Sequence, residues 1–191
     1  GDGADLETLI GLVKHYSPSG EEASAVAWLV ERMRRLGYTQ AFIDEAGNAV
    51  GVMGTGEKQV VFLGHIDTVP GEIPVKISPP LPGDGFGVRG DVLYGRGTVD
   101  AKGPLAAFVD SAAAVGPEDG WQFVVIGAID EERDSIGARY VVDQYRPDFA
   151  IIGEPSQWDR VTLGYKGSAW GEIIVRRAQT HSAAQDQSAP E

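Results

Sequence analysis

Three apolar runs in this sequence each end in side chains that can bind a metal ion. The runs are residues 60–63, 121–129 and 149–152, and each has the length and composition of a buried β-strand. Segments with helical periodicity separate them, which is typical of parallel strands joined by crossover helices. Because open sheets of parallel strands collect their ligands at the carboxyl ends of the strands, the sequence predicts a binding site at that edge.

The first run leads into the sequence GHIDTVP at residues 64–70. An imidazole and a carboxylate two residues apart suit a divalent cation, because His65 can bind the ion while Asp67 orients the ring through its other nitrogen. An isolated pair of this kind is more often a hydrogen-bonded loop pair. The metal hypothesis therefore depends on the side chains at the ends of the other two runs.

Acidic residues occupy those positions. Residues 130–132 (DEE) follow the second run and Glu154 follows the third, while Asp100 lies in a glycine-rich turn at residues 95–103 before a predicted helix. The glycines of that turn match neither the Walker spacing nor G-x-G-x-x-G, so nucleotide binding is not expected. Each acid alone is typical of a solvent-facing loop. Gathered at one edge, the acids would raise each other's pKa unless a cation neutralised them.

The remaining pattern completes an α/β fold, with a largely parallel twisted sheet and helices on both faces. Ser19 and Glu22 form a capping-box pattern at the start of the second helix. His15 is predicted to be a surface or cap histidine at the end of the first helix. The proline-rich and glycine-rich residues 69–89 predict an ordered excursion beside the site. Predicted helices cover residues 6–13, 19–37, 104–114 and 136–145, and further strands cover residues 41–44, 49–53 and 172–176.

Composition excludes several classes of function. The net charge of −12 disfavours nucleic acid as a partner, because phosphate binding depends on Lys and Arg. The chain has no cysteine, so a metal site must use His, Asp and Glu. It has neither a membrane-spanning apolar run nor the pattern of a secretory signal, so we expect no membrane partner and a cytoplasmic location.

The motifs in their order resemble the M20 metallopeptidase and deacylase family. That family includes carboxypeptidase G2, succinyl-diaminopimelate desuccinylase and acetylornithine deacetylase. The resemblance extends from about Leu6 to His181. The motifs that carry it are HID at residues 65–67, GRGTVDAKG at residues 95–103, DEE at residues 130–132 and GEPS at residues 153–156.

Within the family, three segments look most like the lysine and ornithine biosynthesis branch, the hydrolases of amino-group-carrier-protein conjugates of lysine. These segments are residues 64–70, 99–104 and 163–167. The resemblance implies a two-metal-dependent amide hydrolase that releases lysine or ornithine from an N-acyl or carrier-protein conjugate. The alternatives are another M20-type aminoacylase, acetylornithine deacetylase, desuccinylase or dipeptidase, and a non-catalytic paralogue with a binding role.

The resemblance also implies a set of metal ligands. His65, Asp100 and Glu154 would bind one ion, and Asp100 would bridge to a second ion that also takes Glu132. A bridging carboxylate uses both of its oxygens, and two adjacent cations can activate water and polarise a carbonyl. Zinc is the expected metal, with cobalt or manganese as alternatives, because His and carboxylate ligands accept all three.

Three further residues receive catalytic roles from the resemblance. Asp67 would orient His65, and Glu131 would be the general base that passes a proton to the leaving nitrogen. His181 resembles the histidine that stabilises the oxyanion in the partner subunit's active site, although its position also suits an ordinary tail histidine. The chain has no cysteine and no serine in a G-x-S-x-G elbow, so nothing requires a covalent intermediate.

Members of the family are much longer than this chain of 191 residues. The resemblance therefore implies that residues 1–162 form a catalytic domain without its C-terminal segment, and that residues 163–191 begin a small α+β lid or dimerisation domain. In the family, the C-terminal segment that completes the catalytic domain supplies a histidine to the second metal. We therefore expect this chain to be inactive or nearly so. The full-length protein is expected to be a homodimer.

Overall fold

The computed structural model describes residues 6–80, 90–157, 159–164, 166–167, 169 and 171–176. The chain divides into two compact units between residues 158 and 159. The first unit contains all of the described helices and strands. In chain order these are α1 (Glu7–Lys14), α2 (Ala23–Arg35), β1 (Gln40–Ile43), β2 (Ala49–Met53), β3 (Lys58–His65), β4 (Lys76–Ser78), β5 (Val92–Tyr94), α3 (Lys102–Val115), β6 (Trp121–Ala128), α4 (Ile136–Gln144) and β7 (Phe149–Ile152).

Five of the strands form one sheet in the order β1-β2-β6-β3-β7. β3 runs parallel to both β6 and β7, whereas β1 and β2 add an antiparallel edge. In the parallel part, His65 pairs with Ala128 and Leu63 pairs with Ile152. This register brings the three predicted strand ends to the same edge of the sheet. The predicted α/β class, with a mostly parallel sheet, is confirmed.

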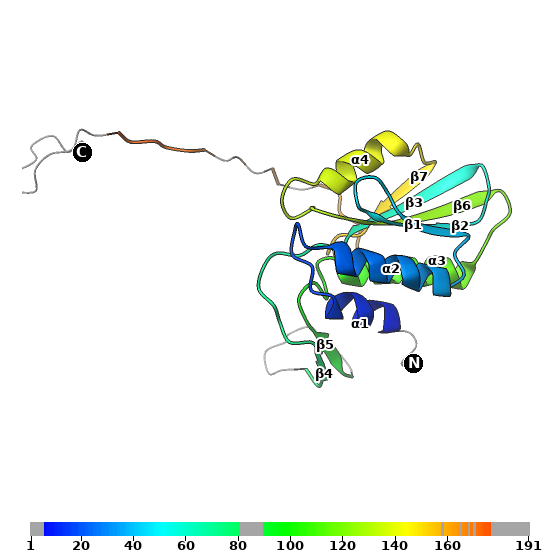
Figure 1. Cartoon of the computed structure of the whole chain (residues 1–191), viewed down its shortest axis with the longest axis horizontal. Coiled ribbons are helices and arrows are strands. Elements are labelled where there is room, and N and C mark those ends of the chain that lie inside the picture. The colour runs from blue at the N-terminus through cyan, green and yellow to red at the C-terminus, as the bar shows by residue number, and fades with distance from the viewer. Residues whose placement is uncertain are drawn as a thin grey trace, which may run out of the picture. The chain divides into compact units, whose positions relative to one another are not determined.

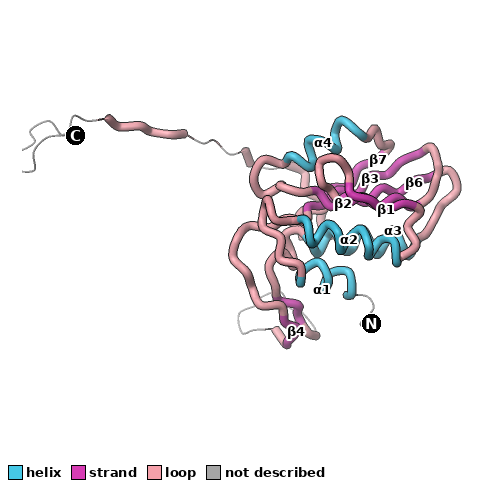
Figure 2. Tube along the Cα trace, viewed as in Figure 1, coloured by secondary structure: helices cyan, strands magenta, loops and turns pink. Residues whose placement is uncertain are grey.

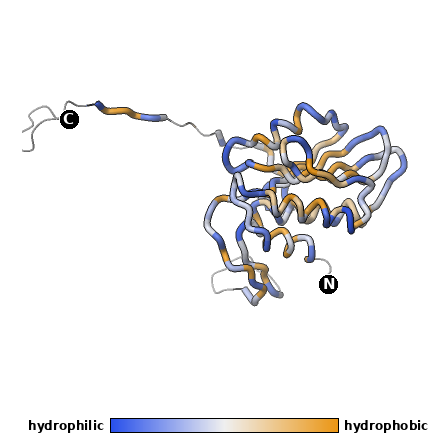
Figure 3. Tube along the Cα trace, in the orientation of Figure 1, coloured by the Kyte–Doolittle hydropathy of each residue, from blue (hydrophilic) through white to orange (hydrophobic). Residues whose placement is uncertain are grey.

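Helices cover both faces of this sheet. α1, α2 and α3 lie on one side and α4 lies on the other (Figure 1). The buried apolar residues form a larger and a smaller hydrophobic core, and β6 contributes to both because its neighbouring residues point to opposite faces of the sheet. Val125 belongs to the larger core, and Val124 and Ile126 belong to the smaller one. Hydrophobic residues, coloured orange, lie along the strands of the sheet (Figure 3). The predicted placement of helices on both faces is therefore confirmed.

The prediction that residues 149–152 form a buried strand is half wrong. The strand exists as β7, but all four of its residues are exposed. β7 pairs with β3 alone, so it is an edge strand, and no other strand among the described residues pairs with its free edge. An apolar run predicts a strand well, whereas burial depends on what packs against it.

The excursion after the first motif has partial structure of its own. β4 and β5 form a separate antiparallel pair, and this pair lies apart from the main sheet (Figure 2). Residues 81–89, which the prediction also included, lie outside the described residues. α3 begins at Lys102, two residues before the predicted start, so the glycine-rich turn leads directly into the helix.

The second unit contains neither helix nor strand among its described residues, 159–176 with gaps. The predicted strand at residues 172–176 is therefore wrong for this chain. A strand needs a neighbour for its backbone hydrogen bonds, and none is described beside these residues. Within the described part of the chain, no helix has the length and apolar character needed to cross a membrane.

Candidate active site

His65 is the last residue of β3, and its ring is almost completely buried. Its Nε2 atom lies 3.0 Å from Asp100 Oδ1 and 3.8 Å from Glu131 Oε2. Its Nδ1 atom lies 3.0 Å from the backbone oxygen of Asp67 and 3.4 Å from Asp67 Oδ1. Both nitrogens of the imidazole therefore lie beside oxygen atoms.

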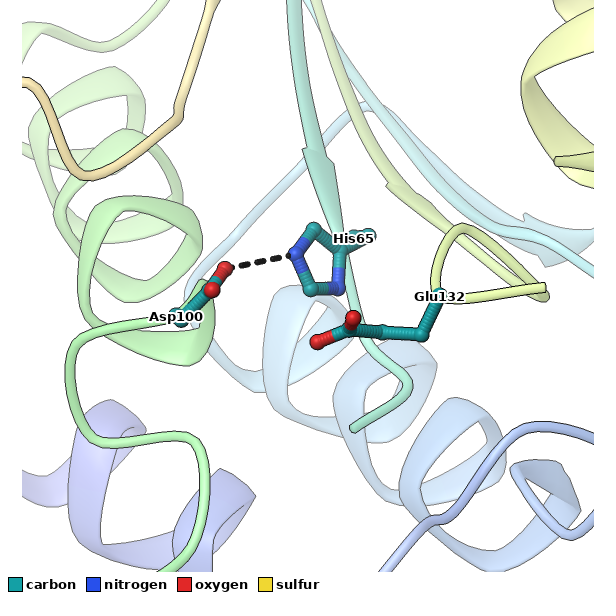
Figure 4. A group of neighbouring side chains, drawn as sticks. All are labelled: His65, Asp100 and Glu132. Atoms are coloured by element: carbon teal, nitrogen blue, oxygen red, sulfur yellow. Dashed lines mark hydrogen bonds and ion pairs between the residues drawn. The ribbon is translucent and has the colours of Figure 1, made fainter. Parts of the chain in front are cut away.

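Asp100 reaches the ring from the turn that precedes α3, and its carboxylate points toward Nε2 (Figure 4). The turn is closely packed. Gly97 has a φ of 79°, and a Cβ atom there would lie 2.8 Å from Thr68 Cγ2, so a larger residue would displace the turn. Its carbonyl accepts a hydrogen bond from the backbone N–H of Lys102 at 3.0 Å. Glycine at position 97 therefore allows the turn to approach the residues after β3.

Lys102 anchors the other side of this turn. Its side chain is fully buried, and Nζ donates hydrogen bonds to the carbonyls of Leu12 and His15 at the end of α1. Burial lowers the pKa of Lys102 to about 8, against the nearby charge of Asp67, which favours the protonated form. The ammonium group thus stabilises the carboxyl end of a helix, where a positive charge is favourable.

Asp67 is fully buried and accepts hydrogen bonds from three sources besides the imidazole. Ser19 Oγ donates to Oδ2 at 2.6 Å, and the backbone N–H groups of Glu131 and Glu132 donate to Oδ1 and Oδ2 at 3.0 and 3.1 Å. Burial alone would raise the pKa of Asp67, but these bonds and the His65 ring lower it below its ordinary value. Asp67 therefore connects the exit of β3 to the exit of β6 as a carboxylate.

The side chains of His65, Asp100 and Glu132 form the candidate metal-binding group. One ligand atom from each residue lies within 4.8 Å of the others. Figure 4 shows the Glu132 carboxylate beside the ring and the Asp100 carboxylate at the Nε2 end. His65 comes from β3, Asp100 from the turn before α3 and Glu132 from the loop after β6. Glu154, the fourth predicted ligand, follows β7 and is not a member of this group among the described residues.

The charges of the site affect one another. Burial raises the pKa values of Glu132 and Glu154, and the neighbouring carboxylates raise them further, against the opposing effect of His65. Asp100 and Glu131 contribute to both shifts. Mutual repulsion of this kind was expected for acids gathered at one sheet edge. A divalent cation among them would relieve it.

The pKa of His65 is raised as well, which in its case favours the charged form. Burial lowers its pKa, but the hydrogen bonds to Asp67 and Asp100 and the charges of Glu131 and Glu154 outweigh that effect and raise the pKa to about 9. A proton on Nε2 thus stabilises the crowded carboxylates in the metal-free protein. The donor set, one imidazole nitrogen and carboxylate oxygens close together, is the chemistry that zinc, cobalt or manganese accepts, so these residues fit a divalent cation.

The structure thus gathers most of the predicted residues at the edge where β3 and β6 end. His65, Asp67, Asp100, Glu131 and Glu132 interact there through the contacts above. Glu154 is connected to them by charge. His181 lies outside the described residues. His15 follows α1, as predicted for a cap histidine, and its ring packs against Trp28 with centroids 5.7 Å apart.

Sequence reasoning missed the contribution of the segment before α2. The capping-box prediction is wrong: neither Ser19 nor Glu22 caps α2 with its side chain. Ser19 instead donates to Asp67, and Glu22 accepts from the backbone N–H groups of Gly20 and Asp130. The same pair of residue types at this spacing can cap a helix or bind distant loops, and the local sequence does not distinguish these two outcomes.

Comparison with known proteins places these residues in a family context. The model of peptidase family M20/M25/M40 matches residues 61–185, a range that includes His65, Asp100, Glu131, Glu132 and Glu154. The LysW-lysine hydrolase of Deinococcus radiodurans is 47% identical over 176 residues, which cover 91% of this chain and 46% of that protein. The LysW-lysine/LysW-ornithine hydrolase of Saccharolobus islandicus is 30% identical, with 93% of this chain and 47% of that protein covered.

Solved structures agree on the fold. A tripeptidase from Staphylococcus aureus superposes with a TM-score of 0.57 at 26% identity, over 78% of this chain and 42% of that one. Human carnosine dipeptidase 1 superposes with a TM-score of 0.58 at 22% identity, over 79% of this chain and 38% of that one. The chain spans about half the length of the curated relatives it matches.

Proposed function

Because this chain belongs to peptidase family M20/M25/M40, we propose that it carries most of the active site of a two-metal amide hydrolase. The observation that carries the proposal is the convergence of His65, Asp100 and Glu132, whose ligand atoms lie within 4.8 Å of one another, with Glu131 beside the same imidazole. The whole activity is proposed for a protein of the relatives' length, since this chain spans about half of it.

Divalent ions, zinc by preference, would supply Lewis-acid polarisation of the amide carbonyl and a lower pKa for the attacking water. His65, Asp100 and Glu154 are the proposed ligands of one ion, and Asp100 and Glu132 of the other. The support for Glu154 is its raised pKa together with its charge interactions with His65 and Asp100.

Glu131 is the proposed general base. Its Oε2 atom lies 3.8 Å from His65 Nε2, so its carboxylate is at the rim of the candidate metal-binding group without belonging to it. A half-exposed carboxylate there can accept a proton from water and pass it to the leaving nitrogen. Asp67 lies beside Nδ1 and keeps the imidazole ring oriented. The buried negative charge of Asp67 also makes the ring more basic and therefore a stronger metal ligand.

The proposed substrate is a lysine or ornithine residue linked through an amide to an amino-group carrier protein. The support is the identity of 47% and 30% to relatives whose names state this substrate class. A simple N-acyl amino acid or a short peptide is the competing substrate. We further propose a cytoplasmic location, a homodimer, and a catalytic domain that ends near residue 162 and is followed by a lid or dimerisation domain, to which His181 would contribute an oxyanion donor.

The decisive experiment is a Glu131→Gln substitution in the protein at the relatives' length, assayed for lysine release from a carrier conjugate, from acetyl-lysine and from a dipeptide. Loss of a general base should lower kcat by about 10²–10⁴-fold while zinc content per chain stays the same. Glu118→Gln, at an exposed glutamate outside the site, is the matched control. Unchanged hydrolysis by Glu131→Gln would refute the mechanism, and preference for the dipeptide would refute the substrate class.

A further inference from the structure

Four consecutive backbone N–H groups at the exit of β6 donate to side-chain oxygens from distant parts of the chain. Ile129 N–H donates to Asn48 Oδ1 at 3.0 Å, and Asp130 N–H donates to Glu22 Oε1 at 3.2 Å. The next two N–H groups, those of Glu131 and Glu132, donate to Asp67. The segment that carries the proposed base and a proposed ligand is therefore fixed through its backbone by three separate side chains.

Glu22 is the acceptor contributed by the segment before α2. Its side chain is buried, and Oε1 also accepts from the backbone N–H of Gly20 at 2.9 Å. The same segment reaches the exit of β3, because Ser17 Oγ donates to the carbonyl of Ile66 at 2.8 Å and Ser19 Oγ donates to Asp67. Residues 17–22 thus link the loop after β3 to the loop after β6.

Asn48 is the acceptor contributed by the turn before β2, and it is fully buried. Its Nδ2 group donates to Asp44 Oδ2 at 2.8 Å and to the carbonyl of Gly137 at 3.1 Å, so the amide contacts both ends of the loop between β6 and α4. A Cβ atom on Gly137 would clash with Asn48 Oδ1 and with the backbone of Ile129. The absence of a side chain at Gly137 is what allows this approach.

The loop between β6 and α4 needs such support because its backbone is strained. Asp130 and Ser135 have φ values of 62° and 53°, in the left-handed region that non-glycine residues adopt only at a cost in free energy. Contacts within the loop stabilise it in part: Ser135 N–H donates to the carbonyl of Asp130 at 2.6 Å, and Arg133 pairs with the Asp130 carboxylate. Strained conformations persist only where their surroundings fix them, and here Asn48 and Glu22 belong to those surroundings.

We propose that Glu22 and Asn48 are positioning residues for Glu131 and Glu132. Neither side chain is a member of the candidate metal-binding group, so both act through the backbone N–H groups of the adjoining residues. Their effect is to set the direction in which the proposed base and the proposed ligand leave the loop. This inference rests on the proposed function for its catalytic consequence, but not for the backbone contacts.

Glu22→Ala removes an acceptor and tests the proposal directly. Glu22→Gln keeps an oxygen at the same position, and Glu21→Ala removes an equal charge from the adjacent exposed residue, so these are the rescue and control variants. Asn48→Ala removes the other acceptor, the one for Ile129 N–H. For each variant, hydrogen exchange at residues 129–132 is measured in the metal-free chain, together with zinc affinity by calorimetry and the melting temperature.

We expect Glu22→Ala and Asn48→Ala to speed amide exchange at residues 129–132 at least about tenfold and to weaken zinc binding about 10–100-fold. Glu22→Gln and Glu21→Ala should stay within about twofold of the unchanged protein on both measures. Unchanged exchange in Glu22→Ala and Asn48→Ala would overturn the proposal. Faster exchange and a lower melting temperature with unchanged zinc affinity would reduce the two residues to a structural role, which also overturns it.

The test separates this proposal from the proposed function. If the unchanged chain binds no zinc, the proposed metal chemistry fails, while amide exchange at residues 129–132 still decides whether Glu22 and Asn48 fix that backbone. If zinc binds tightly and equally in all variants, the metal chemistry survives and the positioning role fails.

Discussion

β6 and β7 look alike in the sequence but differ in the structure. Both are apolar runs that end in acidic residues, and both run parallel to β3. β6 lies between β2 and β3, and its last five residues are buried, whereas β7 is an edge strand whose residues are all exposed. Burial is therefore set by the neighbours of a strand rather than by its composition.

The two strand exits differ in the same way. The loop after β6 is fixed by hydrogen bonds to Asn48, Glu22 and Asp67, so Glu131 and Glu132 leave a well-determined backbone. After β7, Gly153 N–H donates to the carbonyl of Leu63 and Ser156 N–H donates to the carbonyl of Glu154, so these two bonds join backbone groups. At the β6 exit, by contrast, distant side chains accept from four consecutive backbone N–H groups.

The largest expected difference between the strands is the cost of removing the same side chain from each. Ile126→Ala should lower the free energy of unfolding by about 2–5 kcal/mol, because Ile126 is fully buried and its loss leaves a cavity. Ile151→Ala should cost less than about 1 kcal/mol, because Ile151 is 46% exposed. Urea denaturation measures both. Equal losses would show that β7 is buried in solution.

The next effect concerns pH and the exit of β3. The pKa of His65 is raised from 6.5 to about 9 in the folded, metal-free chain. A raised folded-state pKa gives stability that is complete below about pH 6.5 and is lost as the pH rises through 9, on the order of 3 kcal/mol in total. Urea denaturation in chelator at pH 6.5 and 9.5 measures the change. Because the lowered pKa of Lys102 gives stability that rises with pH in this window, the His65 contribution is the difference between the unchanged chain and His65→Gln. The same pH dependence in both would contradict the arrangement of charges around His65.

The smallest effect concerns the acid after β7. Burial and the neighbouring carboxylates raise the pKa of Glu154, so its ionised form is unfavourable in the metal-free chain. Glu154→Gln should therefore stabilise that chain at pH 8 by up to about 1 kcal/mol, a gain limited by the partial exposure of the side chain. Thermal melting in chelator, with Glu118→Gln as the exposed control, measures the change. A clear loss of stability would mean that Glu154 has a favourable partner at the β7 exit.

The sequence predicted most of the elements, because each depends on local periodicity, but not β4 within the excursion or the absence of a strand at residues 172–176. It also predicted the shared edge, since the parallel strands β3 and β6 bring His65 and Glu132 together, while Asp100 reaches them from the turn before α3. It failed where the outcome depends on distant partners. The side chains of Ser19 and Glu22, which were predicted to form a capping box, instead hydrogen-bond to the loops after β3 and β6. The apolar residues of β7 lack the neighbour that would bury them.

Zinc binding to the 191-residue chain tests the central claim most directly. Calorimetry on chelator-treated protein should detect zinc binding that Asp100→Asn weakens at least about 100-fold, because Asp100 is the proposed ligand beside His65 and Glu132. Asp119→Asn, which removes an equal charge at an exposed site, should leave the affinity unchanged. Equal zinc affinity in the unchanged chain and in Asp100→Asn would contradict a metal centre at this edge of the sheet.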